Sequence, residues 1–149
     1  GFEPDKNVFR CLEENISTFE SNILINIALS NENSQKKLYI DSDHGDSSLE
    51  KFASEVTSEV RVSTLDSYNF KKIKLLKMDA EGHEYEVLEG SKKTLKNIEF
   101  ICVDMGNEKG FENENTVASV TNYLLKNKFE LLRFNEERTV GLFKNINTN

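Results

Sequence analysis

Two short apolar runs on either side of a helical segment limit the folds that this chain can adopt. The runs are 73-IKLLKM-78 and 98-IEFICVDM-105. Val87 and Leu88 lie between them, on the inner side of a predicted helix that ends at Gly90. Near-continuous apolar strands that alternate with helices are typical of sheets covered on both faces. The pattern therefore predicts an α/β fold around a mostly parallel sheet.

The rest of the chain continues the same alternation. The sequence predicts further helices over 5–17 and 116–127, and further strands over 22–30, 36–40, 60–65, 129–134 and 139–145. Asp5 is the expected N-cap of the first helix, and the last two strands are expected to pair with each other. A length of 149 residues is typical of one domain, so we expect a single domain over 1–149.

Composition excludes several classes of partner. The net charge of -7 argues against a nucleic acid, because phosphate binding needs a surplus of lysine and arginine. No apolar run approaches the roughly 18 residues that a membrane-spanning helix needs, so no membrane span is expected. Cys11 and Cys102 stand alone in apolar surroundings, which is typical of buried and reduced thiols. We therefore expect a cytoplasmic protein.

Two carboxylates follow predicted strands, at the edge where α/β sheets bind their ligands. Glu3 comes at the end of a first strand, and Asp79 comes directly after the central apolar run. A carboxylate in the position of Glu3 could accept hydrogen bonds from both hydroxyls of a ribose, with Phe2 and Pro4 as apolar surface beside a purine. The alternative is an acidic residue in a turn, which only stabilises the following helix through its dipole.

The stretch 79-DAEGHE-84 gathers carboxylates and an imidazole at the start of a helix. Gly82 permits a tight turn or the close approach of a ligand. Carboxylates that are held close together repel each other, which raises the pKa of one of them and lets it act as a general base near neutral pH. Three interpretations stay open: a metal site formed by Asp79, Glu81 and His83, an acid–base site, and simple capping of the helix.

Several stretches together resemble one family of enzymes. They are 2-FEPDKNVFRCLEENI-16, 26-NIALS-30, 47-SSL-49, 62-VSTLDS-67 and, above all, 74-KLLKMDAEGHEYEVLEG-90. In order and spacing they are similar to the FkbM-type methyltransferases, a branch of the Rossmann-like class I methyltransferases, which use S-adenosylmethionine. The resemblance covers most of the chain and weakens after Asp104. It implies a methyltransferase that acts on a hydroxyl oxygen of a sugar, a glycan or another natural product.

The resemblance also implies which residues bind the cofactor. Glu3 would bind the ribose hydroxyls of S-adenosylmethionine. Phe2 and Pro4 would border the adenosine. Ile27 and Ala28, at the end of the next strand, would line the adenine.

At the reacting end, the resemblance places Asp79 beside the methionine moiety or the acceptor, close to the transferring methyl group. Glu81, His83 and Glu84 would face the acceptor pocket, and 47-SSL-49 would lie near its rim. A base near the acceptor helps methyl transfer because the hydroxyl proton becomes acidic during the reaction. Glu81 or His83 is the candidate for that base, and no metal ion is required.

The chain departs from this family at its start. Class I methyltransferases open with a strand and a glycine-rich turn resembling DxGxxxG, and neither is present here. Their usual strand order is 3-2-1-4-5-7-6, in a mostly parallel sheet with an antiparallel strand near the C-terminus. The first strand lies at the middle of that sheet. We therefore expect a domain that is incomplete at its N-terminus, with weak cofactor binding or none. Its exposed sheet edges would pair with each other, or with a second copy in a homodimer.

A second interpretation comes from another functional class. The chain could be a non-catalytic α/β binding or assembly module that has lost cofactor binding. The absent glycine-rich turn favours this module, whereas the presence of Glu3 and of the whole 79–84 cluster favours an enzyme. A third interpretation is a divalent-metal hydrolase that uses the same cluster. The sequence does not identify the acceptor, and we expect the segments 41–55 and 107–115 to determine specificity.

Overall fold

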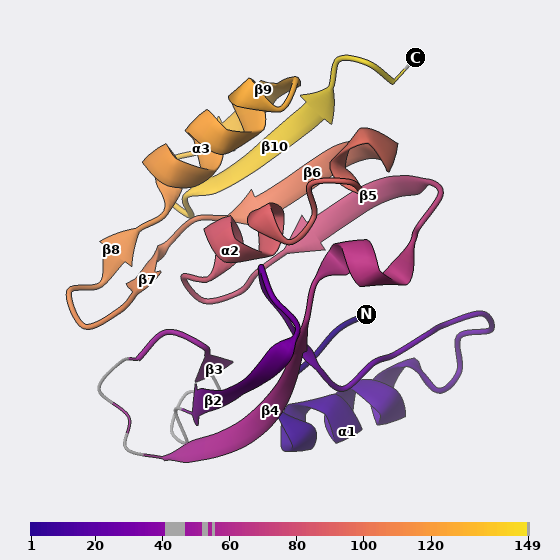
Figure 1. The fold of residues 1–149 in the computed structure, drawn as a ribbon, viewed down its shortest axis with the longest axis vertical. Coiled ribbons are helices and arrows are strands. Elements are labelled where there is room, and N and C mark those ends of the chain that lie inside the picture. The colour runs from indigo at the N-terminus through magenta and orange to yellow at the C-terminus, as the bar shows by residue number, and fades with distance from the viewer. Residues whose placement is uncertain (41–46, 52–53, 55, 149) are drawn as a thin grey trace.

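The computed structural model describes residues 1–40, 47–51, 54 and 56–148 (Figure 1). Within them the helices are α1 (Lys6–Ile16), η1 (Leu65–Tyr68), α2 (Glu84–Glu89), η2 (Leu95–Asn97) and α3 (Val117–Lys126), where η marks a 3-10 helix. The strands are β1 (Ala28–Leu29), β2 (Ser34–Ile40), β3 (Ser47–Ser48), β4 (Thr57–Ser63), β5 (Ile73–Met78), β6 (Ile98–Asp104), β7 (Asn107–Lys109), β8 (Glu114–Asn115), β9 (Phe129–Asn135) and β10 (Val140–Asn145). No helix of this described part is long and apolar enough to cross a membrane.

One sheet holds the main core and has the strand order β5-β6-β10-β9. β5 and β6 are parallel and are connected through α2, whereas β10 is antiparallel to both β6 and β9. The resemblance implied the strand order 3-2-1-4-5-7-6, and this sheet corresponds to its last four strands, 4-5-7-6. The antiparallel strand that the resemblance implied is β10. α2 and α3 pack on this sheet (Figure 1). The buried core between them comprises Met78, Val87, Leu88, Leu95, Ile98, Ile101, Val103, Met105, Val120, Leu124, Phe129 and Phe143.

The second sheet has the order β1-β4-β2-β3. Here β1 is parallel to β4, whereas β4 with β2 and β2 with β3 are antiparallel. The predicted mostly parallel sheet is therefore not confirmed: the described sheets are mixed, and most of their strand pairs are antiparallel. The physical reason is visible in β2 and β4, whose side chains alternate in exposure along much of each strand. Such alternation is typical of antiparallel strands with one face in solvent.

The apolar run 22–30 does not form the predicted buried strand. Only Ala28 and Leu29 are assigned to a strand, and they pair with β4. An isolated parallel bridge joins Phe2 to Ile25, and Ile23 is 76% exposed. Burial is confined to the second half of the run, where Ile27, Ala28 and Ser30 are buried.

β5 lies at the edge of its sheet. Among the described residues no strand pairs with its outer side, and Leu75 is 52% exposed. The prediction of a strand over 73–78 is confirmed in its bounds, but the prediction that it is buried is wrong. The expected direct pairing of the flanking strands is not formed either, since β1 pairs with β4.

The two larger sheets meet on α2 and the residues that follow it, and they share no strand pair in the described part of the chain. The N–H of Asp66, after β4, donates to the carbonyl of Gly90 at 3.1 Å. One carboxylate oxygen of Asp66 accepts from the N–H of Thr94 at 2.8 Å. The amide of Asn31, after β1, donates to Glu89 at 3.2 Å. Contacts at α2 therefore determine how the two sheets face each other.

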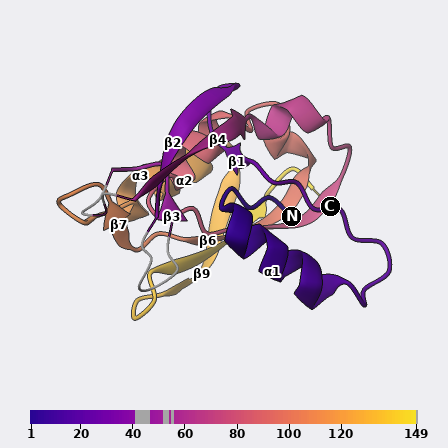
Figure 2. The ribbon, with the colours of Figure 1, turned by 90° about the horizontal axis from the view of Figure 1, so that it is seen from below.

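α1 begins as the sequence predicted. The carboxylate of Asp5 caps it by accepting from the N–H groups of Asn7 and Val8, at 2.7 and 3.0 Å. Figures 1 and 2 show α1 on the opposite side of the molecule from α3. α1 has no buried residue, so Cys11 is exposed. The expectation of a buried thiol is wrong there, and Cys102 in β6 is partly exposed.

Candidate active site

A cavity of about 500 Å³ lies between the two larger sheets, with walls from β1, β2 and β5 and from the turn after β5. This volume is in the range of ligand pockets, roughly 300–1,000 Å³. The cavity is also lined by every residue that the sequence singled out for cofactor binding or catalysis: Phe2, Glu3, Pro4, Ile27, Ala28, Asp79, Glu81 and His83. The structure thus brings residues from three separate stretches of the chain to one place.

Glu3 lies on the wall formed by the start of the chain. Its N–H donates to the carbonyl of Ile25 at 3.2 Å, and its Oε1 accepts from the N–H of Asp5 at 2.7 Å. Burial raises the pKa of the Glu3 carboxyl, and the hydrogen bond from Asp5 opposes this shift. Beside it, the ring of Phe2 meets the ring of Tyr68 edge-on, with centroids 5.0 Å apart. This wall therefore combines a half-buried hydrogen-bond acceptor with an aromatic surface.

The turn after β5 forms the opposite wall. Asp79 is exposed and forms an ion pair with Lys77. Glu81 and Gly82 both have positive φ angles, of 48° and 90°, and glycine adopts this region without strain. A Cβ atom on Gly82 would lie 2.7 Å from the Cα of Lys109 in β7. Gly82 thus permits both the tight turn and the close approach of another backbone, which is the protein's own β7–β8 hairpin.

Glu84 has a structural role. It is 1% exposed and does not line the cavity, so the expectation that it faces an acceptor pocket is wrong. Its Oε1 accepts from the N–H groups of Ala80 and Gly82, at 3.1 and 3.0 Å. Its Oε2 accepts from the hydroxyl of Thr116 at 2.9 Å. Glu84 therefore does not cap α2, whose N-cap His83 makes no side-chain capping bond; its carboxylate closes the preceding turn and ties it to the start of α3.

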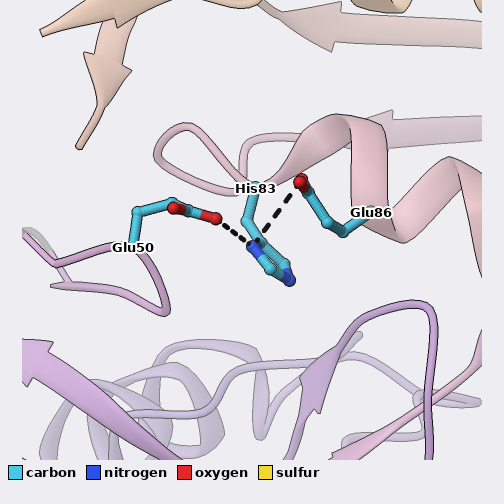
Figure 3. Close-up of side chains that lie close together, drawn as sticks. All are labelled: Glu50, His83 and Glu86. Carbon is cyan, nitrogen blue, oxygen red and sulfur yellow. Dashed lines mark hydrogen bonds and ion pairs between the residues drawn. The ribbon is translucent and has the colours of Figure 1, made fainter.

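His83 is 6% exposed in its side chain, and partners engage both of its ring nitrogens. Figure 3 shows Glu50 and Glu86 beside one of them, Nδ1. Nδ1 lies 2.8 Å from Oε1 of Glu50 and 3.7 Å from Oε2 of Glu86. Nε2 lies 2.8 Å from the hydroxyl oxygen of Ser30. Since a carboxylate only accepts hydrogen bonds, Nδ1 donates to Glu50, and Nε2 shares a hydrogen bond with the hydroxyl of Ser30. In this arrangement neither nitrogen is available to a further hydrogen-bond partner.

A lysine lies beside the same group. Nζ of Lys109 is 2.8 Å from Oε1 of Glu86 and 3.8 Å from Oε1 of Glu50. Among the described residues, Glu50, His83 and Glu86 have ligand atoms within 4.8 Å of one another, a grouping that could hold a metal ion. The predicted metal site shares only His83 with this grouping. The ammonium group of Lys109 faces the carboxylates of Glu86 and Glu50 and offsets part of their negative charge.

Comparison with known proteins establishes the family. Residues 1–131 match the sequence model of the methyltransferase FkbM domain. This chain belongs to the FkbM methyltransferase family. The fold is similar to the crystal structure of methyltransferase FkbM from Methylobacillus flagellatus KT, with a TM-score of 0.56 and 17% sequence identity. The alignment covers 96% of this chain and 35% of that one, so the chain spans about a third of its neighbour's length. A comparison with curated proteins gives no match.

Sequence reasoning missed four members of the site in this FkbM domain: Ser30, Glu50, Glu86 and Lys109. Glu86 had a usable signal, because it lies three residues after His83 on a predicted helix and therefore on the same side. Ser30 and Glu50 had none, since they are 53 and 33 residues away from His83. The contacts of these residues arise only when the two sheets and the β7–β8 hairpin come together. Residues 41–46, 52–53 and 55 of the expected specificity segment lie outside the described residues.

Glu50 leads to a prediction about pH. The hydrogen bond with His83, helped by the charge of Lys109 and opposed by burial, holds the pKa of Glu50 below its ordinary value of 4.5. A carboxylate with a lowered pKa contributes stability above the pKa of the unfolded chain, and this stability is lost as the pH falls through the folded value. The difference in free energy of unfolding between wild type and Glu50→Gln should therefore be largest near neutral pH and shrink below about pH 4.5.

The measurement is urea denaturation followed by circular dichroism between about pH 7 and about pH 3. Glu20→Gln is the control, because Glu20 is exposed and does not line the cavity. A difference between wild type and Glu50→Gln that does not change with pH would contradict the prediction.

Proposed function

We propose that this domain is an S-adenosylmethionine-dependent methyltransferase that methylates a hydroxyl oxygen on a sugar, a glycan or another natural product. Membership of the FkbM family supports methyl transfer. The observation that carries the proposal is the shared cavity: the eight candidate residues from the stretches 2–4, 27–28 and 79–83 line it together. They supply an apolar wall and a carboxylate at one end, and further carboxylates at the other.

The residues at the first end fit the nucleoside part of such a cofactor. The half-buried carboxylate of Glu3 can accept hydrogen bonds from the two ribose hydroxyls. Phe2 and Pro4 offer apolar surface for the adenosine, and the buried Ile27 and Ala28 offer it for the adenine. When bound, S-adenosylmethionine supplies an electrophilic methyl group.

At the other end we assign the base to Glu81. His83 is less suited to this role, because Glu50 and Ser30 engage both of its ring nitrogens. In the proposed reaction the acceptor oxygen forms its bond to the methyl carbon while the sulfur–methyl bond breaks, and the hydroxyl proton passes to the carboxylate of Glu81. Asp79 lies two residues earlier on the same wall, where its carboxylate orients the acceptor or the methionine moiety.

The test is calorimetric titration of S-adenosylhomocysteine, the product form of the cofactor, into the full chain and into Glu3→Gln. Glutamine has the size of glutamate but no charge, so it loses charge-assisted hydrogen bonds worth about 1.5–3 kcal/mol each. We therefore expect Glu3→Gln to raise the dissociation constant by about tenfold or more.

Glu20→Gln is the matched control, since it makes the same change of charge at an exposed site outside the cavity. Equal affinities of Glu3→Gln and Glu20→Gln would remove Glu3 from the cofactor site. If the wild-type chain does not bind S-adenosylhomocysteine at all, the proposed activity of this chain fails.

A non-catalytic α/β binding or assembly module is the second candidate. The edge of β5 favours it, because no strand of the described residues pairs with its outer side and Leu75 is exposed there. Such an edge can add a strand from another chain, and a homodimer is the simplest assembly of this kind. Sedimentation of the wild type and of Leu75→Lys tests it: a dimer that Leu75→Lys dissociates would support the module.

We also propose a small-molecule or glycan acceptor rather than a nucleic acid, and a cytoplasmic location. The net charge of -7 supports the first. The two cysteines support the second, because both are free thiols in the structure.

A further inference from the structure

The short segment 47–51 forms part of the cavity wall next to the turn after β5. Ser47 and Leu49 line the cavity. The segment is bonded to the turn by the hydroxyl of Ser48, which donates to the carbonyl of Glu81 at 2.6 Å. The N–H of Glu50 donates to the same hydroxyl oxygen at 3.0 Å. The segment thus touches the residue to which we assign the base.

His83 is the second link to this segment. Its Nδ1 donates to Glu50, and its Nε2 shares a hydrogen bond with the hydroxyl of Ser30, directly after β1. Because His83 itself precedes α2, one imidazole joins three parts of the fold: the segment 47–51, the residue after β1 and the helix α2. Figure 3 shows the Glu50 side of this link. Ser30 is 0% exposed and its position is further held by the N–H bond to the carbonyl of Ser63, at 2.9 Å.

The β7–β8 hairpin supports the link from the other side. Lys109 bridges Glu86 and Glu50, and the ammonium group of Lys51 lies 5.4 Å from the centroid of the Phe111 ring. The charge of Lys109 helps keep the carboxylate of Glu50 ionised and therefore a strong acceptor for Nδ1–H. The segment 47–51 is thus held by a polar network rather than by a long strand, since β3 has two residues.

We propose that Glu50 is a positioning residue: acting through His83, it holds the segment 47–51 against the turn after β5 and so sets the width of the acceptor end of the cavity. The proposal rests on the proposed function, because it is the methyltransferase assignment that makes this end the acceptor site. In-line methyl transfer depends on the position of the acceptor, and a misplacement of about 1 Å costs on the order of 100-fold in rate. Because the segment 47–51 is hydrogen-bonded to the turn that carries Glu81, this wall of the cavity limits such misplacement.

The experiment compares the wild type, Glu50→Ala and Glu50→Gln by NMR on the full chain. The chain has two histidines, so signals missing in His83→Gln identify His83. In Glu50→Ala we expect the Nδ1-bound proton of His83 to be lost, and the amides of Ser48 and Leu49 to exchange at least about tenfold faster after correction for intrinsic rates. Glu50→Gln should rescue both signals, because its amide oxygen still accepts from Nδ1–H.

Glu99→Ala is the control, since it removes a carboxylate that pairs with Lys74 and does not line the cavity. Unchanged exchange and an unchanged Nδ1 proton in Glu50→Ala would overturn the proposal. So would a failure of Glu50→Gln to restore them.

Titration of S-adenosylhomocysteine separates this proposal from the proposed function. We expect Glu50→Ala to bind it within about twofold of the wild type, because Glu50 does not line the cavity and the segment that it holds lies away from the cofactor end. A loss of more than about tenfold would overturn the assignment to the acceptor end. If the wild type does not bind, the proposed function fails, whereas the exchange rates still decide whether Glu50 holds the segment.

Discussion

Replacing Gly90 with alanine should lower the free energy of unfolding by about 3 kcal/mol or more. A Cβ atom there would lie 1.9 Å from the carbonyl oxygen of Ser30 and 3.2 Å from the Cα of Asn31. Both are backbone atoms, so no side-chain rotation relieves the clash. The φ angle of Gly90 is -75°, which alanine adopts freely, so the cost comes from contact and not from conformation. The end of β1 would have to move away from α2.

Urea denaturation followed by circular dichroism measures this effect, and Gly110→Ala is the matched control. Gly110 has a φ of 68° and nothing within 4 Å of its Cβ position. Its replacement should cost about 1–2 kcal/mol, through the left-handed conformation alone. If the two variants lose equal stability, close packing of β1 on α2 is not what requires Gly90.

Gly90→Ala should also loosen the hydrogen bonds that hold the segment 47–51 in the cavity wall. Ser30 forms a hydrogen bond with His83, and His83 donates to Glu50. A shift of β1 would therefore lengthen the hydrogen bonds that hold the segment 47–51. We expect the Nδ1 proton signal of His83 to broaden in this variant even under conditions in which the chain stays folded. An unchanged signal would show that β1 and the His83 network move independently.

Replacing Glu84 with alanine is the second change with a large expected effect. It removes the acceptor for the N–H groups of Ala80 and Gly82 and for the hydroxyl of Thr116. A buried donor without a partner costs about 1–3 kcal/mol, so the loss of free energy of unfolding should be about 3 kcal/mol or more. The turn 79–83 should lose its conformation at the same time. Its loss would weaken the binding of S-adenosylhomocysteine, because the turn carries part of the cavity wall.

Glu84→Gln is the informative comparison. Its amide oxygen can still accept from both backbone N–H groups, and the hydroxyl of Thr116 can rotate to accept from its NH₂ group. We expect a loss of about 1 kcal/mol for Glu84→Gln, measured by the same denaturation. If glutamine is as damaging as alanine, it is the charge of Glu84 and not its hydrogen bonds that the turn requires.

Local patterns predicted the elements of the second half of the chain well. β5, α2, β6, α3, β9 and β10 all lie where apolar spacing placed them. The capping role of Asp5 and the end of α2 at Gly90 were equally readable, because a cap depends on residues within one turn of helix. Interactions of this range are encoded in neighbouring residues, so a single sequence suffices to predict them.

The same patterns failed where neighbours in space decide the outcome. The run 22–30 reads as a buried strand, yet Ile23 is 76% exposed and only Ala28 and Leu29 of the run belong to a strand. Leu75 in β5 is exposed as well. Composition measures how readily a segment is buried, but burial requires a partner surface, and the partner is supplied by the rest of the fold.

In the candidate site, too, the sequence predicted one part and the tertiary structure decided the other. The resemblance to the FkbM family was enough to select Phe2, Glu3, Pro4, Ile27, Ala28, Asp79, Glu81 and His83, and all eight line the cavity. The roles within the cluster after β5 needed the tertiary structure: Glu84 turned inward to close the turn, and His83 became bonded to Ser30 and Glu50. Which side chain meets which across 33 or 53 residues depends on how the two sheets dock on α2, and no local pattern encodes that docking.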